Sequence, residues 1–308
     1  MAQARLLDTP QCIYRGTETD PDRWRAWNPR VGDILVCTPP KSGTTWTQTI
    51  LTMLINGGPD LPEKVPVMSP WIDGDLGIPA NEVAATLDKQ QRRRVIKTHT
   101  PADGFPVWDG VTVIAVYRHP LDVFFSMRKH IKNMAEIDGD HPMLLPVSQS
   151  LMHFVDGDFD PNDWDNDNLA TLSRHYRATV LSGRLPGLHT FHYAEMIADG
   201  RRAVERLAQV TGIEADNRLI EAVAEATAFG AMKSKAKDYA PVGGTGFWKS
   251  DAAFFDSASS RKWEGQLSEE ELALYKRRLA ERIPDVRSRA WLENGDQADE
   301  EVDSRSGV

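Results

Sequence analysis

Four short stretches of the chain are rich in apolar and β-branched residues, and polar or glycine-containing sequence follows each of them. They are residues 33–38, 94–98, 111–117 and 190–193. Short apolar runs of this kind are typical of strands that are buried on both faces of a parallel sheet. The pattern therefore predicts four strands of such a sheet.

Between these stretches, apolar residues recur at the spacing of an α-helix. In residues 44–56, Trp46, Ile50, Met53 and Leu54 lie on one helical face, and two glycines follow. Strands that alternate with helices predict an α/β fold, in which helices flank a parallel β-sheet and ligands bind at the carboxyl ends of the strands. The further helices are expected at residues 121–131, 194–211 and 217–229.

The net charge of −9 is unevenly distributed over the 308 residues. Residues 156–168 and 293–303 each contain six acidic residues and no basic one. The other 36 basic and 33 acidic residues give the rest of the chain a charge of +3. This excess of positive charge favours a small anionic ligand, whereas the negative net charge of the whole chain argues against a nucleic-acid partner. We expect a single domain over residues 1–292 and a disordered acidic tail over residues 293–308.

Two cysteines, Cys12 and Cys37, are too few for a disulfide framework. No stretch approaches the roughly 18 continuous apolar residues of a membrane span. Residues 1–16 lack the basic and apolar segments of a secretory signal. These features predict a cytoplasmic protein, and they leave its oligomeric state open.

Residues 38–46 join the first expected strand to the first expected helix. Gly43 allows a ligand to approach the backbone closely, and the first amides of a helix point outward at the positive end of its dipole. Lys41 adds a positive charge, and Thr44 and Thr45 add hydroxyls. This P-loop-like strand–loop–helix unit predicts a site for an oxyanion. In a Walker nucleotide loop the lysine follows a glycine, and here it precedes one.

The order Pro-Lys-Ser-Gly-Thr-Thr-Trp at residues 40–46 resembles the 5′-phosphosulfate loop of cytosolic-type sulfotransferases, which use 3′-phosphoadenosine 5′-phosphosulfate (PAPS). The resemblance spans about residues 30–265 and indicates a bacterial member of this family. Five other segments match the family. Residues 95–101 are similar to its catalytic-histidine strand, and residues 113–126 to its 3′-phosphate segment. Residues 190–196 are similar to its tyrosine-bearing strand end, residues 227–233 to its adenine-side segment, and residues 243–249 to its glycine-rich loop.

The resemblance implies transfer of a sulfuryl group from PAPS to an acceptor hydroxyl, with no metal required. It makes His99 the general base, and Lys41 the group that stabilises charge on the departing phosphate. Lys97 is expected to lower the pKa of His99 and to share the work of Lys41. The residues expected to bind the donor are Lys41, Ser42, Gly43, Thr44, Thr45, Trp46, Arg118, Ser126, Tyr193, Thr227, Phe229 and Gly243.

One part of the family pattern is missing. The family usually has an Arg-Lys-Gly that holds the 3′-phosphate, and the chain, aligned on Gly246 and Trp248, has Pro-Val-Gly at residues 241–243. The missing charges leave a catalytically weakened homologue as one alternative, and a nucleotide-binding P-loop kinase-like protein is the other. Candidates to hold this phosphate instead are the amides of residues 243–245 and the cations Lys233, Lys235, Lys237, Arg261 and Lys262.

The acceptor is expected to be a small molecule, namely a phenol, a sterol or a lipid-like alcohol. The acidic residues 156–168 are expected to form a mobile lid at the mouth of its pocket, with Trp164 pointing inward, because this segment is too polar for the core. The residues expected to line the pocket, which would suit a core equally well, are Met68, Trp71, Phe124, Met134 and Trp164.

Overall fold

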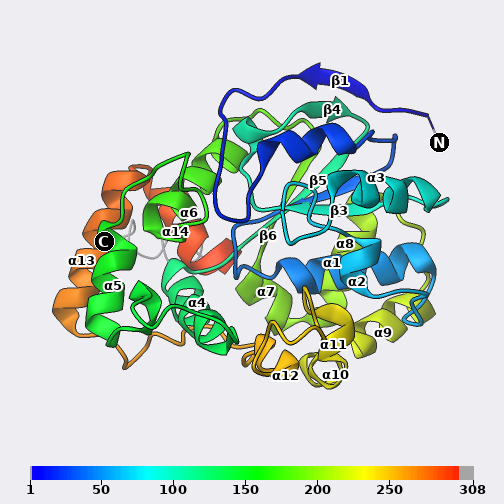
Figure 1. Cartoon of the computed structure of the whole chain (residues 1–308). Coiled ribbons are helices and arrows are strands. Elements are labelled where there is room, and N and C mark those ends of the chain that lie inside the picture. Colours follow the sequence, from blue (N-terminus) through cyan, green and yellow to red (C-terminus); the bar gives the residue numbers. More distant parts are fainter. Residues whose placement is uncertain (1, 298–308) are drawn as a thin grey trace, which may run out of the picture.

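A computed structural model describes residues 2–297 (Figure 1). The strands are β1 (Arg5–Asp8), β2 (Ile34–Cys37), β3 (Val95–Thr98), β4 (Val107–Asp109), β5 (Thr112–Tyr117) and β6 (Leu188–His192). The helices are α1 (Thr44–Asn56), α2 (Val65–Met68), α3 (Ala80–Lys89), α4 (Pro120–Asn133), α5 (Val147–Asp156), α6 (Leu169–Tyr176), α7 (Tyr193–Ala198), α8 (Gly200–Thr211), α9 (Asn217–Ala226), α10 (Phe229–Ser234), α11 (Ala236–Tyr239), α12 (Asp251–Phe254), α13 (Glu269–Arg282) and α14 (Val286–Asn294). Among these helices, none is long and apolar enough to cross a membrane.

The central sheet contains the four strands that the sequence predicts. Their order is β3-β2-β5-β6, and all neighbouring strands in it are parallel. β1 and β4 form a separate antiparallel pair, which lies at one edge of the molecule near the N-terminus (Figure 1). The predicted α/β fold, with helices flanking a parallel sheet, is confirmed.

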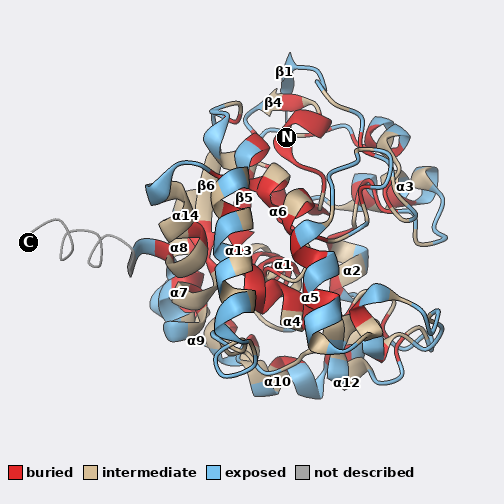
Figure 2. Ribbon diagram, turned by 90° about the vertical axis from the view of Figure 1, so that its left-hand side faces the viewer, coloured by how far each residue is buried: buried red, intermediate tan, exposed pale blue. Residues whose placement is uncertain are grey.

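Side chains of the sheet alternate between its two faces. Ile34 and Val36 pack in a cluster with α1, α8 and α9, whereas Leu35 and Cys37 pack in a second cluster with the N-terminal segment. On β5, Tyr117 joins a third cluster with α4, α5, α6 and α13. Both faces of the sheet are therefore buried, which explains why these strands read as apolar runs. Figure 2 shows exposed residues along the outer sides of α5 and α13.

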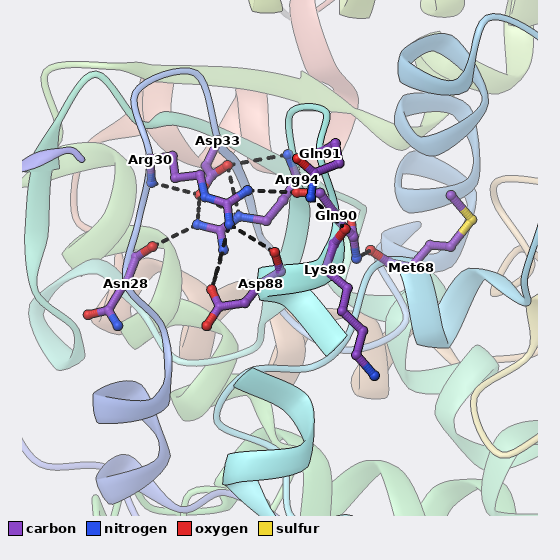
Figure 3. A network of polar contacts seen from close by, with 9 residues as sticks. All are labelled: Asn28, Arg30, Asp33, Met68, Asp88, Lys89, Gln90, Gln91 and Arg94. Carbon is purple, nitrogen blue, oxygen red and sulfur yellow. Dashed lines mark hydrogen bonds and ion pairs between the residues drawn. The ribbon is translucent and has the colours of Figure 1, made fainter. Parts of the chain in front are cut away.

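A buried ion pair connects the amino ends of β2 and β3. Arg94 and Asp33 are fully shielded from solvent, and Arg94 Nη2 lies 2.6 Å from Asp33 Oδ2. The same Nη2 donates to the carbonyl oxygen of Asn28 at 2.7 Å, and Nη1 lies 3.6 Å from Asp88 Oδ1 (Figure 3). Removal of one partner would leave an uncompensated buried charge, so the network fixes the relative position of the two strands.

The structure differs from the sequence-based expectation in the last third of the chain. The helix expected over residues 194–211 is divided into α7 and α8, because the side chain of Asp199 accepts a hydrogen bond from the Arg202 amide and starts a new helix. Residues 293–297 belong to α14 and the turn after it, where Glu293 accepts a hydrogen bond from the Tyr275 hydroxyl at 3.0 Å. The rest of the expected tail, residues 298–308, lies outside the described residues.

Candidate active site

The carboxyl ends of β2, β3 and β5 open into a cavity of about 860 Å³. Lys41, Lys97, His99 and Arg118 lie together in its wall, as expected from their positions at the strand ends. Gly43 to Trp46, Ser126, Tyr193, Thr227 and Phe229 also line it, whereas Ser42 and Gly243 lie outside its wall.

Two residues in the left-handed conformation shape the loop between β2 and α1. Lys41 has a φ of 60° and Gly43 a φ of 110°. A Cβ atom at Gly43 would lie 2.9 Å from the Tyr193 ring, so a side chain does not fit there. The first amides of α1, which have no acceptors within the helix, begin at this loop. The loop and the helix end together form a concave site suited to an anion.

His99 is held in one tautomer. Its Nδ1 lies 2.7 Å from the carbonyl oxygen of Thr38, which can only accept, so Nδ1 carries the proton. Nε2 is therefore the acceptor, and it lies 3.2 Å from Lys97 Nζ. Burial, and after it the charge of Lys97, keeps the pKa of His99 well below 6.5. The imidazole is neutral near pH 7 and can take a proton on Nε2.

The two lysines beside His99 are weaker bases than usual. Burial, and after it the charge of Arg118, lowers the pKa of Lys41 to about 7. Burial also lowers the pKa of Lys97 to about 8, and the charge of Glu18 partly opposes this shift. Because an anionic ligand would favour the charged form of both lysines, this end of the cavity suits a donor with several negative charges.

Arg118 and Ser126 also lie in the cavity wall, and Arg118 Nη1 donates to the Lys41 carbonyl oxygen at 3.3 Å. The Arg118 side chain is buried, its Nη2 donates to the Ser259 carbonyl oxygen at 2.8 Å, and its guanidinium lies 4.4 Å from the centre of the Tyr193 ring. Ser126 follows on the second turn of α4 and also lines the cavity. Both residues thus line the same cavity, and their shared role in holding a phosphate stays a prediction.

A loop of residues 256–262 supplies a further cation to the cavity wall. Lys262 lines the cavity and forms an ion pair with Asp256, which also accepts a hydrogen bond from Lys129 Nζ at 2.5 Å. The amides of residues 261 and 262 donate to the buried carboxylate of Asp122 on α4, at 2.9 and 2.7 Å. The loop is thus attached to the helix that carries Ser126. The sequence indicates this cation through two adjacent basic residues, Arg261 and Lys262, which precede Trp263.

The amides of residues 243–245 already have acceptors. The Gly243 amide donates to the Ala240 carbonyl oxygen at 3.1 Å, and the Gly244 amide donates to Asp251 at 3.1 Å. The Thr245 amide donates to a carbonyl oxygen at 3.3 Å. These amides, which the sequence offered for the 3′-phosphate, are therefore already engaged, two of them with carbonyl oxygens of the same turn and that of Gly244 with the Asp251 side chain.

The aromatic candidates Trp46, Tyr193 and Phe229 line the cavity. The rings of Trp46 and Tyr193 are 6.0 Å apart at an edge-to-face angle of 76°. Phe229 begins α10, and the nearby Thr227 hydroxyl donates to the Val223 carbonyl oxygen at 2.8 Å. Flat apolar surfaces of this kind can hold a base by stacking.

The acidic segment lies at the cavity, attached to the N-terminal segment. Asp165 accepts hydrogen bonds from the Glu18 and Thr19 amides at 2.7 and 2.9 Å, and Trp164 is 4% exposed with its ring 4.6 Å from that of Tyr14. Its mobility stays a prediction. Of the residues expected in the acceptor pocket, Trp71, Met134 and Trp164 line the cavity, whereas Met68 and Phe124 lie outside its wall.

His130 is a cavity residue that the sequence-based reasoning missed. Its Nδ1 lies 2.9 Å from Lys41 Nζ. The signal was available in the sequence, since residues four apart on a helix share a face and His130 follows Ser126 by four. Among residues 2–297, no cluster of three or more histidine, cysteine or acidic residues has a geometry that could hold a metal ion.

Comparison with known proteins places this site in a family. A family model described as a sulfotransferase domain matches residues 31–286. A glycolipid sulfotransferase of Mycobacterium tuberculosis is 35% identical over 302 residues, which cover 90% of this chain and 92% of that protein. Sulfotransferase 2A1 of Macaca fascicularis is 22% identical over 260 residues, which cover 82% of this chain and 85% of that protein.

Solved structures show the same fold. A mouse sulfotransferase, SULT7A1, complexed with PAP, superposes with a TM-score of 0.67 at 18% identity, covering 93% of this chain and 98% of that one. A retinol dehydratase in complex with androsterone and PAP superposes with a TM-score of 0.66 at 17% identity, covering 86% and 84%.

Proposed function

The chain belongs to the sulfotransferase family, and we propose that it transfers a sulfuryl group from PAPS to a hydroxyl of an amphipathic, glycolipid-like acceptor. The observation that carries the chemistry is the His99 imidazole, whose Nε2 is an acceptor next to Lys97 in the same cavity as Lys41. The kinase-like alternative is overturned by the family match.

His99 and Lys41 divide the chemical work in this proposal. PAPS supplies a sulfuryl group whose bond to a phosphate oxygen breaks as the acceptor oxygen bonds to sulfur. His99 Nε2 takes the acceptor's proton, and Thr38 holds the ring in the tautomer that this requires. Lys41 stabilises the negative charge that the broken bond leaves on the phosphate oxygen. Lys97 lies within 3.2 Å of the base and adds a second charge there.

The donor is proposed to lie across the loop after β2. The amides at the start of α1 suit the 5′-phosphosulfate, and Trp46, Tyr193 and Phe229 suit the adenine. Arg118, Ser126 and Lys262 suit the 3′-phosphate, so that Lys262 replaces one charge of the missing pair.

The rest of the cavity wall supports an amphipathic acceptor. Residues Met127, Ile131, Met134, Ile137 and Phe247 provide an apolar part of the wall, and Glu18, Asp163, Asn166 and Asp167 provide a polar part. Carboxylates and amides accept hydrogen bonds from sugar hydroxyls, whereas the apolar part suits a lipid chain. The relative at 35% identity is named a glycolipid sulfotransferase, and a glycolipid has both a sugar and a lipid part, which supports an acceptor of this kind.

The acceptor proposal is tested by magnesium-free transfer of labelled sulfate from PAPS. We expect kcat/KM for a sugar-bearing lipid to exceed that for a sugar-free lipid alcohol and for a simple phenol by roughly tenfold or more, because both parts of the wall are then filled. Incubations with the His99→Ala variant measure the background of labelled product that forms without catalysis. Equal values for the three acceptors would contradict the proposed acceptor class and leave the donor chemistry intact.

We predict that Lys262→Ala weakens the enzyme's preference for 3′-phosphoadenosine 5′-phosphate (PAP) over AMP by about tenfold. AMP lacks the 3′-phosphate, and a hydrogen bond between charged groups contributes about 1.5–3 kcal/mol. The measurement is calorimetric binding of both nucleotides. Arg261→Ala is the matched control, because its side chain is exposed and pairs with Glu264. An unchanged PAP/AMP ratio in Lys262→Ala would remove Lys262 from the phosphate site.

A cytoplasmic location also stays a proposal. It is supported by the two cysteines, Cys12 and Cys37, which are free in the described part of the chain.

A further inference from the structure

His130 lies on α4, one helical turn after Ser126, and its ring forms part of the cavity wall. The ring centre is 4.7 Å from that of Trp248 and 5.6 Å from that of Phe254. Its Nδ1 faces the Lys41 ammonium at 2.9 Å. The side chain is therefore packed on aromatic rings and directed at one of the expected catalytic groups.

The chemistry of the pair determines which atom donates. An ammonium can only donate, so Nδ1 of His130 accepts the hydrogen bond from Lys41. Burial, and after it the charges of Lys41 and Lys97, keeps the pKa of His130 well below 6.5, so the ring is neutral and its lone pair is available. Lys41 Nζ also lies 4.7 Å from the centre of the Phe254 ring. The ammonium is thus held between an imidazole acceptor and an aromatic ring.

We propose that His130 is a positioning residue for Lys41, which fixes its ammonium at the donor end of the cavity. The inference rests on the proposed function in one respect, namely that Lys41 acts on the donor. The contact between the two side chains is independent of that role.

The surroundings of Lys41 explain why its charge needs support. Arg118, Lys262 and Lys97 all repel its positive charge, and Asp256 is the acidic group that opposes them. With burial, these charges bring the pKa of Lys41 to about 7. His130 accepts a hydrogen bond that the charged form of Lys41 makes best, so its loss should lower that pKa further.

The test compares His130→Phe, which keeps a ring without an acceptor, with His130→Gln, which keeps an acceptor. The first readout is the pH dependence of acetylation of Lys41, measured by mass spectrometry of its peptide, and it needs no donor. The second is the pH profile of kcat/KM for PAPS. His141→Gln is the matched control, because His141 also lines the cavity and its Nδ1 accepts instead from the Met143 amide.

In His130→Phe we expect the acetylation midpoint of Lys41 and the alkaline limb of the kcat/KM profile to move down by about one pH unit, since a hydrogen bond to a charged group has roughly this value. Above the midpoint, kcat/KM should then fall by about tenfold. His130→Gln and His141→Gln should match the wild type. An acetylation midpoint in His130→Phe equal to that of the wild type would overturn the proposal. A shifted midpoint with an unmoved kcat/KM profile would support the contact and count against the role of Lys41 in transfer.

Discussion

Replacement of His99 by alanine is expected to reduce kcat for sulfuryl transfer by about 10²–10⁴-fold, the usual contribution of a general base, and to leave PAP binding close to wild type. The reason is that Nε2 of His99 is the neutral acceptor in the cavity next to Lys97, whereas phosphate groups would be held elsewhere. Single-turnover transfer from labelled PAPS, together with calorimetric PAP binding, measures both quantities.

The same prediction includes a pH dependence. Because burial holds the pKa of His99 well below 6.5, the base of the free enzyme stays unprotonated as the pH falls through 6.5, and kcat/KM should show no loss in that range. Activity should fall only when the pH approaches the lowered pKa. His141→Ala, at another cavity histidine, is the control. A rate in His99→Ala within about tenfold of wild type, or an acid limb at pH 6.5, would remove His99 from the role of base.

Lys41→Ala is expected to lower kcat by about 10²–10³-fold, a typical cost of removing one group that stabilises charge in the transition state. It should also weaken PAP binding, because the ammonium attracts the phosphate before and after the reaction. Comparing kcat from single turnovers with the Kd for PAP separates the two effects.

Lys41→Arg serves as the control for this variant. It retains the positive charge, so PAP binding should recover more than kcat, since a guanidinium places its donors differently from an ammonium. Unchanged turnover in Lys41→Ala would mean that the loop after β2 is only a structural turn, despite its left-handed residues at 41 and 43.

The parts of the site that the sequence predicted well are local in the chain. The loop between β2 and α1 needs a glycine at position 43 and a lysine two residues earlier, and both are visible in a short motif. His99 and Arg118 each follow an apolar run directly, so a parallel sheet brings them to the same edge whatever the details of the helices. Their assembly follows from the strand pattern alone.

The parts that sequence reasoning missed, or left among several candidates, depend on contacts between distant segments. Lys262 reaches the cavity because the amides of residues 261 and 262 bind Asp122, which lies about 140 residues earlier in the chain. The sequence named Lys262 only as one of five candidate cations, because the position of its loop is set by that carboxylate. The contact between His130 and Lys41 likewise joins residues 89 positions apart.

The sequence by itself determined the α/β class, the strand–loop–helix anion site and the family, because apolar periodicity and short motifs encode structure over neighbouring residues. Tertiary structure alone decided which charges converge, and hence how strongly burial changes the pKa values of Lys41 and His99. It also decided that the loop of residues 256–262 lines the cavity, whereas the amides of residues 243–245 donate to Ala240, Asp251 and Val242. The physical reason is that desolvation and charge–charge interaction depend on distances in space, which packing between remote elements sets.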